Sequence, residues 1–300
     1  MYMKNKILIT GGAGFIGNEI IKLIKKKNKL VVVDIKKNRE IINKFKKLKI
    51  KYIVGNLNDQ KFVIKILKNV KVIYHLAGIT KVPSTDINLN KRKEKIIYNN
   101  SVNLMNNLIH NLPKNTKIVF PSTHLVFENC KINKKVFYEN SKPLPKLAYA
   151  SGKLECEKIL KKSNINYSIL RLGSVYGNAE KKRMFNLPNL FVLRTKNNKN
   201  LKLFSGGVQI KSIVSVNDVA RAMLYLSKDR FKRGLYHIVS EHLTVKKIGN
   251  YCKKFNQNIK LIPTKDKIPY LGYYINCSKI LRTGFKFKNN YKNFVKNYLT

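Results

Sequence analysis

The sequence is short of acidic residues. It has 15 Asp and Glu against 62 Lys and Arg among 300 residues, which gives a formal net charge of +47 at pH 7. A basic excess favours association with nucleic acids. Here the charge is mostly lysine, spread from end to end beside abundant Asn and Ile, whereas specific nucleic-acid sites more often cluster Arg with aromatic residues. We therefore attribute the charge to compositional bias, expect no specific nucleic-acid partner, and expect the surface to attract anions such as phosphorylated substrates.

Cysteine and long apolar runs are scarce as well. The four cysteines are widely spaced and form no C-x-x-C pair: Cys130, Cys156, Cys252 and Cys277. This usage is typical of a cytoplasmic protein with reduced thiols, and we expect no metal. No apolar run approaches the roughly 20 residues of a membrane-spanning helix. The first expected strand begins at Lys6, which leaves no room for a signal peptide, so we expect no membrane association.

Strands and helices alternate through the first part of the chain. Apolar, β-branched runs predict strands at Lys6–Thr10, Leu30–Asp34, Lys51–Val54, Val72–Leu76, Lys117–Pro121 and Tyr167–Arg171. Helical patterns lie between them, at Phe15–Lys27, Arg39–Leu48, Gln60–Lys68, Lys91–His110 and Leu147–Lys162. This alternation predicts an α/β fold with a doubly wound parallel sheet and helices on both faces.

A Gly-rich segment, Thr10–Gly17, joins the first strand to the first helix. It reads T-G-G-A-G-F-I-G, and the strand after the helix ends in an acid. Strand, Gly-rich turn, helix and terminal acid form the unit that binds a dinucleotide. Gly11 permits the sharp turn, Gly14 lets the backbone approach the pyrophosphate, and Gly17 lets the helix pack closely. The helix N-terminus then holds the pyrophosphate. The expected contacts are Gly11, Gly14, Phe15, Ile16 and Gly17.

Asp34, at the end of the second strand, indicates which dinucleotide is bound. A carboxylate there accepts hydrogen bonds from the ribose hydroxyls and repels a 2′-phosphate. We therefore expect NAD rather than NADP, although Lys36 and Lys37 stand nearby. After the third strand, Asp59 either caps the next helix or contacts adenine. After the fourth strand, small residues let the backbone approach the cofactor, at Leu76, Ala77 and Gly78. His75 is expected to pack within its strand rather than to act in catalysis.

The regular alternation ends at Arg171. Beyond it Pro188, Gly206-Gly207, Pro263 and Pro269 interrupt the pattern. We expect residues 1–171 to form a Rossmann-type NAD-binding domain and residues 172–300 to form mainly a smaller substrate-binding lobe. A return segment near 212–240, with a strand at Gly234–Val239, is expected to rejoin the main sheet.

Tyr149 and Lys153 form the candidate catalytic pair. Four residues apart on a predicted helix, they point the same way, one turn apart. A neutral phenol is a poor base because its ordinary pKa is about 10, but a nearby ammonium and the positive nicotinamide of NAD favour the phenolate. Ser122 and Thr123 follow the fifth strand, at the edge where ligands bind in such sheets. A hydroxyl there can hydrogen-bond the substrate oxygen that loses or gains the proton.

These motifs resemble those of the extended short-chain dehydrogenase/reductases, in particular the NAD-dependent epimerase/dehydratase group that acts on nucleotide sugars. The resemblance runs through nearly the whole chain and includes Thr10–Gly17, Asp34, Gly55–Asp59, His75–Gly78, Asn100, Ser122–Phe127, Tyr149/Lys153, Arg171, Val175–Gly177 and Gly206–Asp218. It implies that Tyr149 is the acid/base, that Lys153 also holds the nicotinamide ribose, and that Thr123 orients the substrate hydroxyl. It also implies cofactor contacts at Leu57, Asn58 and Asn100, and a homodimer formed through the helices Lys91–His110 and Leu147–Lys162.

The chain departs from that family pattern on the substrate side. Dehydratases of the group carry an Asp-Glu pair where Thr123-His124 stands, so 4,6-dehydration is not expected. Ser174 stands where the epimerases often have Asn. Lys211 replaces the Arg that grips the substrate diphosphate, and no second arginine is evident near Asp266–Pro269. Lysine can still neutralise phosphate, but without the bidentate fork. The candidate substrate contacts are His124, Ser174 and Lys211.

Three functions are consistent with these residues. The leading one is a nucleotide-sugar 4-epimerase, in which Tyr149 removes the C4 hydroxyl proton, NAD takes the C4 hydride, and the hydride returns to the other face of a transient 4-keto sugar. The alternative is an NAD(P)-dependent 4-keto-6-deoxysugar reductase or sugar dehydrogenase, which the segment Ser122–Phe127 and Ser174 favour. A non-catalytic NAD- or RNA-binding member is the third, but it would need neither Thr123 nor the Tyr149/Lys153 pair.

Overall fold

Two compact units make up the chain in the computed structural model. The model describes residues 6–24, 29–79, 91–130, 132, 135–178, 186–266 and 271–300. The first unit comprises Met1–Glu128, Pro143–Arg171 and Ala220–Tyr236, and the second comprises Asn129–Lys142, Leu172–Val219 and His237–Thr300. Lys25–Lys27, expected in the first helix, and Pro269 lie outside the described residues. None of the helices in the described stretches has the length and apolar character needed to cross a membrane.

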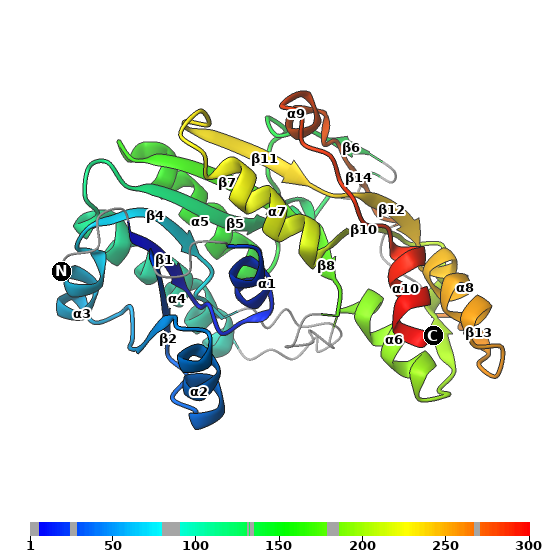
Figure 1. Ribbon diagram of the computed structural model, residues 1–300. Coiled ribbons are helices and arrows are strands. Elements are labelled where there is room, and N and C mark those ends of the chain that lie inside the picture. The colour runs from blue at the N-terminus through cyan, green and yellow to red at the C-terminus, as the bar shows by residue number, and fades with distance from the viewer. Residues whose placement is uncertain are drawn as a thin grey trace. The chain divides into compact units, whose positions relative to one another are not determined.

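A central sheet forms the middle layer of the first unit (Figure 1). Counted over the described residues it has seven strands, in the order β11-β7-β5-β4-β1-β2-β3. They are β1 (Lys6–Thr10), β2 (Leu30–Asp34), β3 (Lys51–Val54), β4 (Val70–His75), β5 (Lys117–Thr123), β7 (Asn166–Leu172) and β11 (Gly234–Ile238). Strand β1 pairs in parallel with β2 on one side and β4 on the other. The strand order therefore reverses between β1 and β4, the point where open α/β sheets bind ligands.

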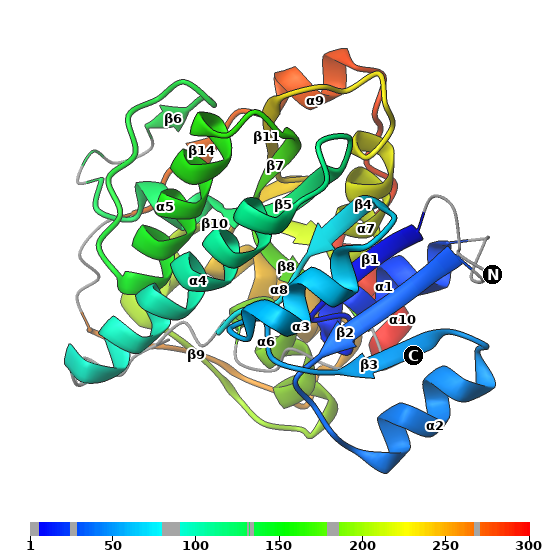
Figure 2. The ribbon, with the colours of Figure 1, turned by 90° about the vertical axis from the view of Figure 1, so that its left-hand side faces the viewer.

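Helices cover both faces of this sheet, which confirms the predicted doubly wound α/β fold. They are α1 (Phe15–Leu23), α2 (Arg39–Lys47), α3 (Gln60–Leu67), α4 (Lys91–Asn111), α5 (Ala148–Lys162) and α7 (Val216–Leu226). Helices α3, α4 and α5 lie on one face and α1 on the other (Figures 1 and 2). Helix α1 ends earlier than predicted, at Leu23, because the buried Ile24 already has an extended backbone.

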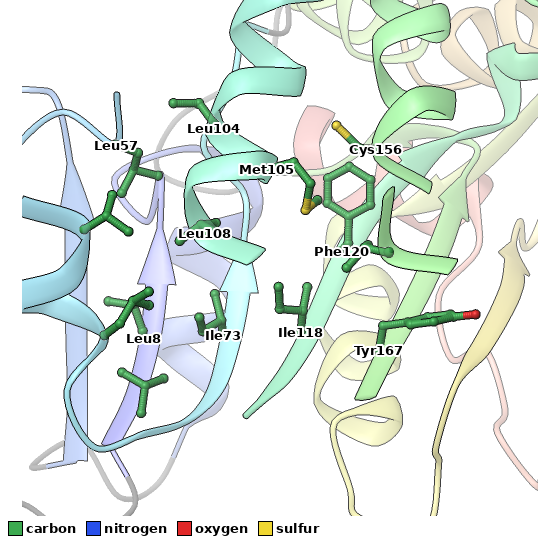
Figure 3. Packing of buried hydrophobic residues seen from close by; sticks show 14 of the residues in the cluster. Leu8, Leu57, Ile73, Leu104, Met105, Leu108, Ile118, Phe120, Cys156 and Tyr167 are labelled. Atoms are coloured by element: carbon green, nitrogen blue, oxygen red, sulfur yellow. The ribbon is translucent and has the colours of Figure 1, made fainter. Parts of the chain in front are cut away.

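The core of the first unit lies between the sheet and the helices α3, α4 and α5. Figure 3 shows β-strand side chains such as Leu8, Ile73 and Ile118 facing Leu108 of α4 and its neighbours. Burial of each such aliphatic side chain contributes about 1.5 to 3 kcal/mol, so this layer fixes the two helices α4 and α5 against the strands. Since α5 begins just before the candidate catalytic tyrosine, the same layer supports the candidate site.

The second unit is built from short elements. Its strands are β6 (Val136–Phe137), β8 (Ser174–Tyr176), β9 (Leu201–Leu203), β10 (Ile210–Ser215), β12 (Glu241–Thr244), β13 (Leu261–Pro263) and β14 (Tyr274–Ile275). Its helices are α6 (Leu187–Lys196), α8 (Val245–Phe255), α9 (Ser278–Arg282) and α10 (Tyr291–Leu299). Strand β10 pairs in parallel with β8 and antiparallel with β12. The core of this unit gathers side chains of α6, α8 and α10 around β8, with Tyr291 fully buried.

Two carboxylates hold the C-terminal segment within the second unit. The buried Asp218 accepts hydrogen bonds from the backbone N–H groups of Lys288 (3.0 Å) and Asn289 (2.9 Å). Glu241 accepts one from Tyr291 N (2.7 Å), at the start of α10. Burial raises the pKa of Glu241, since the charged form loses hydration there.

Candidate active site

The Gly-rich turn lies at the switch point of the sheet. Gly11 has a positive φ of 68°, and a Cβ at this position would stand 2.6 Å from the backbone nitrogen of Ala77, after β4. A Cβ on Gly17 would stand 2.5 Å from the oxygen of Gly12. Any side chain at either position would therefore force the turn apart. Gly14 is the N-cap of α1, and Phe15 and Ile16 open the helix.

Asn18 braces this turn, a role that the motif analysis did not identify. Its side-chain nitrogen donates to the oxygen of Gly14 (2.9 Å), and its side-chain oxygen accepts a hydrogen bond from Lys44 Nζ in α2 (2.8 Å). The Asn18 side chain is thus fixed between the Gly-rich turn and helix α2. A polar residue buried on the first helix was the signal available in the sequence, but its partners lie on other elements.

Asp34 lies beside the turn, at the carboxyl end of β2. Its carboxylate is buried and accepts hydrogen bonds from Ala13 N (3.1 Å) and Lys36 N (3.2 Å). Tyr52 on β3 stands nearby, and burial together with the charge of Asp34 raises the pKa of its phenol to about 12. Ala13 belongs to the Gly-rich turn, so Asp34 is tied to the segment expected to hold the pyrophosphate.

The other predicted cofactor contacts follow the strands β3 and β4 or lie on α4. Leu57 is buried, whereas Asn58 and Gly78 are exposed. Leu76 donates from its backbone nitrogen to Thr10 O (2.9 Å), beside Ala77. These residues lie where the strands β3 and β4 end, so each is at the carboxyl edge of the sheet. Asp59 accepts a hydrogen bond from Phe62 N (3.1 Å) and is the N-cap of α3, the first of its two expected roles.

Tyr149 and Lys153 lie in the first and second turns of α5, and both are buried. Lys153 Nζ donates to Pro121 O on β5 (2.9 Å) and stands 4.4 Å from the centre of the Phe120 ring. A hydrogen bond and the face of an aromatic ring both stabilise a buried ammonium. The ammonium is therefore fixed near the end of β5, on a carbonyl two residues before Thr123.

Strand β5 continues to Thr123, two residues beyond the predicted end at Pro121. Thr123 Oγ1 accepts a hydrogen bond from Leu125 N (3.1 Å) and caps the 3-10 turn His124–Phe127, in which His124 is buried. The hydroxyl hydrogen of Thr123 is not used by that bond. Ser122 instead donates to Glu157 Oε1 (2.6 Å). The two neighbouring hydroxyls thus have different tasks, and Thr123 is the one suited to contact a substrate.

A buried ion pair fixes Ser122. Arg171 Nη2 lies 2.8 Å from Glu157 Oε2, both side chains are essentially without exposure, and Arg171 Nε donates to Glu157 Oε1 (3.0 Å). Glu157 therefore joins α5 to both β5 and β7. The family resemblance includes Arg171 but implies no role for it, and no sequence motif includes Glu157. Its position two turns after Tyr149 was the available signal.

His75 packs within its strand, as expected. It is buried, stacks on Phe120, and its Nδ1 lies 2.8 Å from Thr10 Oγ1. Burial, together with the charge of Lys153, lowers the pKa of His75 to about 3. A neutral imidazole bound to a threonine is a structural residue here.

Ser174 and Lys211, the remaining substrate candidates, belong to the second unit. Ser174 begins β8 and is half-buried, and it pairs with Ile213 of β10. Lys211 lies on β10, opposite Leu243 of β12. Burial lowers the pKa of Lys211 to about 8, because the ammonium is poorly hydrated among these strands. An anionic partner stabilises a poorly hydrated ammonium of this kind more than it stabilises the ammonium of an exposed lysine.

The residues of the first unit fit a dinucleotide. The first turn of α1 has glycine as its N-cap, so its N–H groups are left for an anion rather than for a capping side chain. Asn100 on α4 has a buried side-chain oxygen without a hydrogen-bond partner in the described stretches. A buried acceptor of this kind suits a hydroxyl or amide of a ligand. In the same stretches, no group of three or more His, Cys, Asp or Glu side chains is placed to hold a metal ion.

Comparison with known proteins agrees with this fit. A putative UDP-glucose 4-epimerase of Methanocaldococcus jannaschii is 30% identical over 231 residues, 73% of this chain and 72% of that protein. Two solved structures share the fold: a UDP-glucose 4-epimerase of Thermotoga maritima with UDP-glucose (21% identity, TM-score 0.82, 98% of this chain and 97% of that chain) and a dTDP-glucose 4,6-dehydratase of Streptomyces venezuelae with NAD (20%, 0.81, 98% and 95%).

The family model that matches is the NAD dependent epimerase/dehydratase family, over residues 7–238. That range contains the Gly-rich turn, the acid at the end of β2 and the Tyr149/Lys153 pair. Because the match spans most of the chain, the protein belongs to the NAD-dependent epimerase/dehydratase family and is an enzyme of the extended short-chain dehydrogenase type that uses NAD.

Proposed function

We propose that the protein is a nucleotide-sugar 4-epimerase that works through a transient 4-keto sugar. The observation that carries the proposal is the arrangement at the end of β5, where Pro121 O holds the buried Lys153 ammonium, one helical turn from Tyr149, and where the strand ends at Thr123. An acid/base, a cation and a hydroxyl at one sheet edge suit proton transfer to and from a sugar hydroxyl. The similarity to a putative UDP-glucose 4-epimerase supports the same substrate class.

In the proposed mechanism the chain's own residues move the proton and hold the reacting groups. Tyr149, as phenolate, takes the proton of the C4 hydroxyl, and the positive charge of Lys153 stabilises that phenolate. Thr123 donates its hydroxyl hydrogen to the C4 oxygen and keeps it beside Tyr149. NAD, when bound, supplies hydride acceptance and donation at C4. Tyr149 finally returns its proton to the C4 oxygen of the inverted sugar.

The proposed cofactor contacts divide by task. The Gly-rich turn and the first N–H groups of α1 would hold the pyrophosphate. Asp34 would accept hydrogen bonds from the adenosine ribose, and Lys153 would donate to the nicotinamide ribose. Asn100 would give its buried oxygen to a donor of the cofactor. Leu57, Asn58, Leu76, Ala77 and Gly78 complete the proposed set.

For the substrate we propose a nucleoside diphosphate sugar, with Lys211 toward the diphosphate and His124 and Ser174 toward the sugar. Thr123-His124 replaces the Asp-Glu pair of the dehydratases, which favours epimerisation over 4,6-dehydration. We further propose a cytoplasmic homodimer: the described cysteines are free thiols, as is usual in the cytoplasm, and helices α4 and α5 are the ones through which family members pair.

A 4-keto-6-deoxysugar reductase is the second candidate. Ser174 in place of Asn favours it, because the epimerases often carry an amide at this position. A reductase consumes reduced cofactor with each turnover, whereas an epimerase recycles it. The loss of NADH absorbance during turnover therefore separates the two.

The first experiment is to denature the purified protein without added cofactor and identify the released small molecules by mass spectrometry. Released NAD together with interconversion of UDP-glucose and UDP-galactose supports the proposal. Protein without NAD, stoichiometric NADH consumption and no interconversion would replace it with the reductase.

A further inference from the structure

Helix α5, which carries Tyr149 and Lys153, begins without the usual capping side chain. Its N-cap is Leu147, which has no polar side-chain atom to accept from the helix. The first backbone N–H groups of a helix have no partner within the helix and need another acceptor when they are not in water. For Leu147 and Ala148, and for Lys146 just before them, the acceptors come from elsewhere in the chain.

Two glutamates supply them. Glu128 Oε1 accepts hydrogen bonds from Lys146 N (3.0 Å) and Leu147 N (2.6 Å). Glu94 Oε2, from the first turn of α4, accepts one from Ala148 N (2.9 Å). Three consecutive N–H groups just before Tyr149 are thus held by two carboxylates that are distant in sequence.

The surroundings of Glu128 show that this contact has an electrostatic cost. Burial and the negative charge of Glu94 raise the pKa of Glu128, while its backbone hydrogen bonds and the charge of Lys146 act in the opposite direction. The sequence has only 15 acidic residues against 62 basic ones, and two of the acidic residues lie at the start of this one helix. Two carboxylates are also favourable there because the helix N-terminus carries a partial positive charge.

Glu128 is also linked through the backbone to Thr123, the other candidate catalytic residue. It directly follows the 3-10 turn His124–Phe127, whose N-cap is Thr123. Val126 O in the same turn accepts a hydrogen bond from Leu144 N (2.6 Å). The turn that begins at Thr123 is therefore fastened to the segment that leads into α5.

We infer that Glu128, with Glu94, is a positioning residue for catalysis: it sets the place of Tyr149 relative to Thr123 by holding the start of α5 against the turn that follows β5. This inference rests on the proposed function, because it assigns Tyr149 and Thr123 their proposed roles. Displacement of an acid/base group by about 1 Å can lower a rate about a hundredfold. The glutamates act through the backbone N–H groups that they hold.

The test compares Glu128→Ala, Glu128→Gln and Glu94→Ala in the full-length, NAD-loaded protein, with UDP-galactose as the substrate. We expect E128A to lower kcat about 10- to 100-fold, with the KM for UDP-galactose and the NAD content per chain unchanged. E128Q keeps an amide oxygen that can accept the same bonds, so it should stay within about fivefold of the wild type. E94A removes a single bond and should have the smaller loss of the two alanine variants.

Glu155→Ala is the matched control. Glu155 also lies on α5, but its partner is Lys158 on the helix surface (3.0 Å), away from the helix start. It removes the same charge and should leave kcat unchanged. If E128A does not fold, E94A and E128Q carry the comparison.

The outcomes separate the inference from the proposed function. An inactive wild type, or a fully active Tyr149→Phe variant, overturns the proposed function and the inference with it. An active wild type and an inactive Y149F, combined with unchanged kcat in E128A and E94A, overturns the inference alone. A loss of kcat in E128A that glutamine does not restore, or one accompanied by loss of NAD, also overturns it.

Discussion

In the first unit carboxylates hold backbone beside the candidate catalytic and cofactor-binding residues, whereas in the second unit carboxylates hold the C-terminal segment. Glu128 accepts N–H groups at the start of α5, and Asp34 accepts Ala13 N beside the Gly-rich turn. Asp218 and Glu241 instead accept N–H groups at Lys288 and Tyr291, where α10 begins. In a chain with few acids, these carboxylates thus accept hydrogen bonds from backbone N–H groups that have no other partner in a helix or strand. Loss of such a carboxylate-to-backbone hydrogen bond should therefore lower kcat in the first unit and the free energy of unfolding in the second.

The contrast between the units predicts its largest effect on activity, in the first unit. In Tyr149→Phe we expect turnover of UDP-galactose to fall by about 10²- to 10⁴-fold, because the variant cannot exchange the C4 hydroxyl proton. NAD should remain bound and the thermal transition should remain near that of the wild type. The measurement is kcat beside NAD content by mass spectrometry. Loss of NAD from Y149F would mean that the hydroxyl serves binding rather than proton transfer.

The next effect is on stability, in the first unit. Glu157→Gln keeps the volume but leaves the buried Arg171 charge without its counterion, and we expect the free energy of unfolding to fall by about 3 to 5 kcal/mol. Glu155→Gln, on the same helix but in a surface pair with Lys158, should cost no more than about 1 kcal/mol. Urea denaturation of both variants measures the difference. Equal stabilities would show that the buried pair contributes nothing beyond a surface pair.

Asp218→Ala tests the second unit. It removes the acceptor of Lys288 N and Asn289 N, and we expect the free energy of unfolding to fall by about 2 to 3 kcal/mol. Hydrogen exchange at these two amides should increase more than exchange in α5. If exchange in α5 increases equally, Asp218 acts on the whole molecule and the contrast between the units does not hold.

The smallest expected effect concerns Lys211. Burial lowers the pKa of Lys211 to about 8, so the ammonium is present below that pH and is lost as the pH rises through it. Because an anionic diphosphate binds the charged form, the KM for UDP-galactose should rise about tenfold between pH 7 and pH 9. Lys211→Arg stays charged over this range and should remove the rise. A wild-type KM that does not change with pH would exclude a diphosphate contact at Lys211.

Local patterns predicted the framework of the first unit well. The strands β1, β2 and β3 have the expected bounds because each is a short apolar run that ends at a turn signal. The exact end of β5 was not predictable from propensity. Ser122 and Thr123 continue the strand because Glu157 satisfies one hydroxyl and the following turn uses the other. The roles of the candidate site residues remain predictions, since the fold gives their positions and not their chemistry.

The βαβ alternation, the Gly-rich turn and the Tyr149/Lys153 pair follow from the amino-acid sequence alone. Each depends on residues close together in the chain, whose spacing alone fixes their relation on a helix or turn. Which acids support the Tyr149/Lys153 pair depends instead on tertiary packing. Glu94 lies 54 residues from Ala148, and Glu128 lies 19 from Leu147. No local periodicity relates such partners, because they meet only when packing of the sheet and α4 brings them to the start of α5.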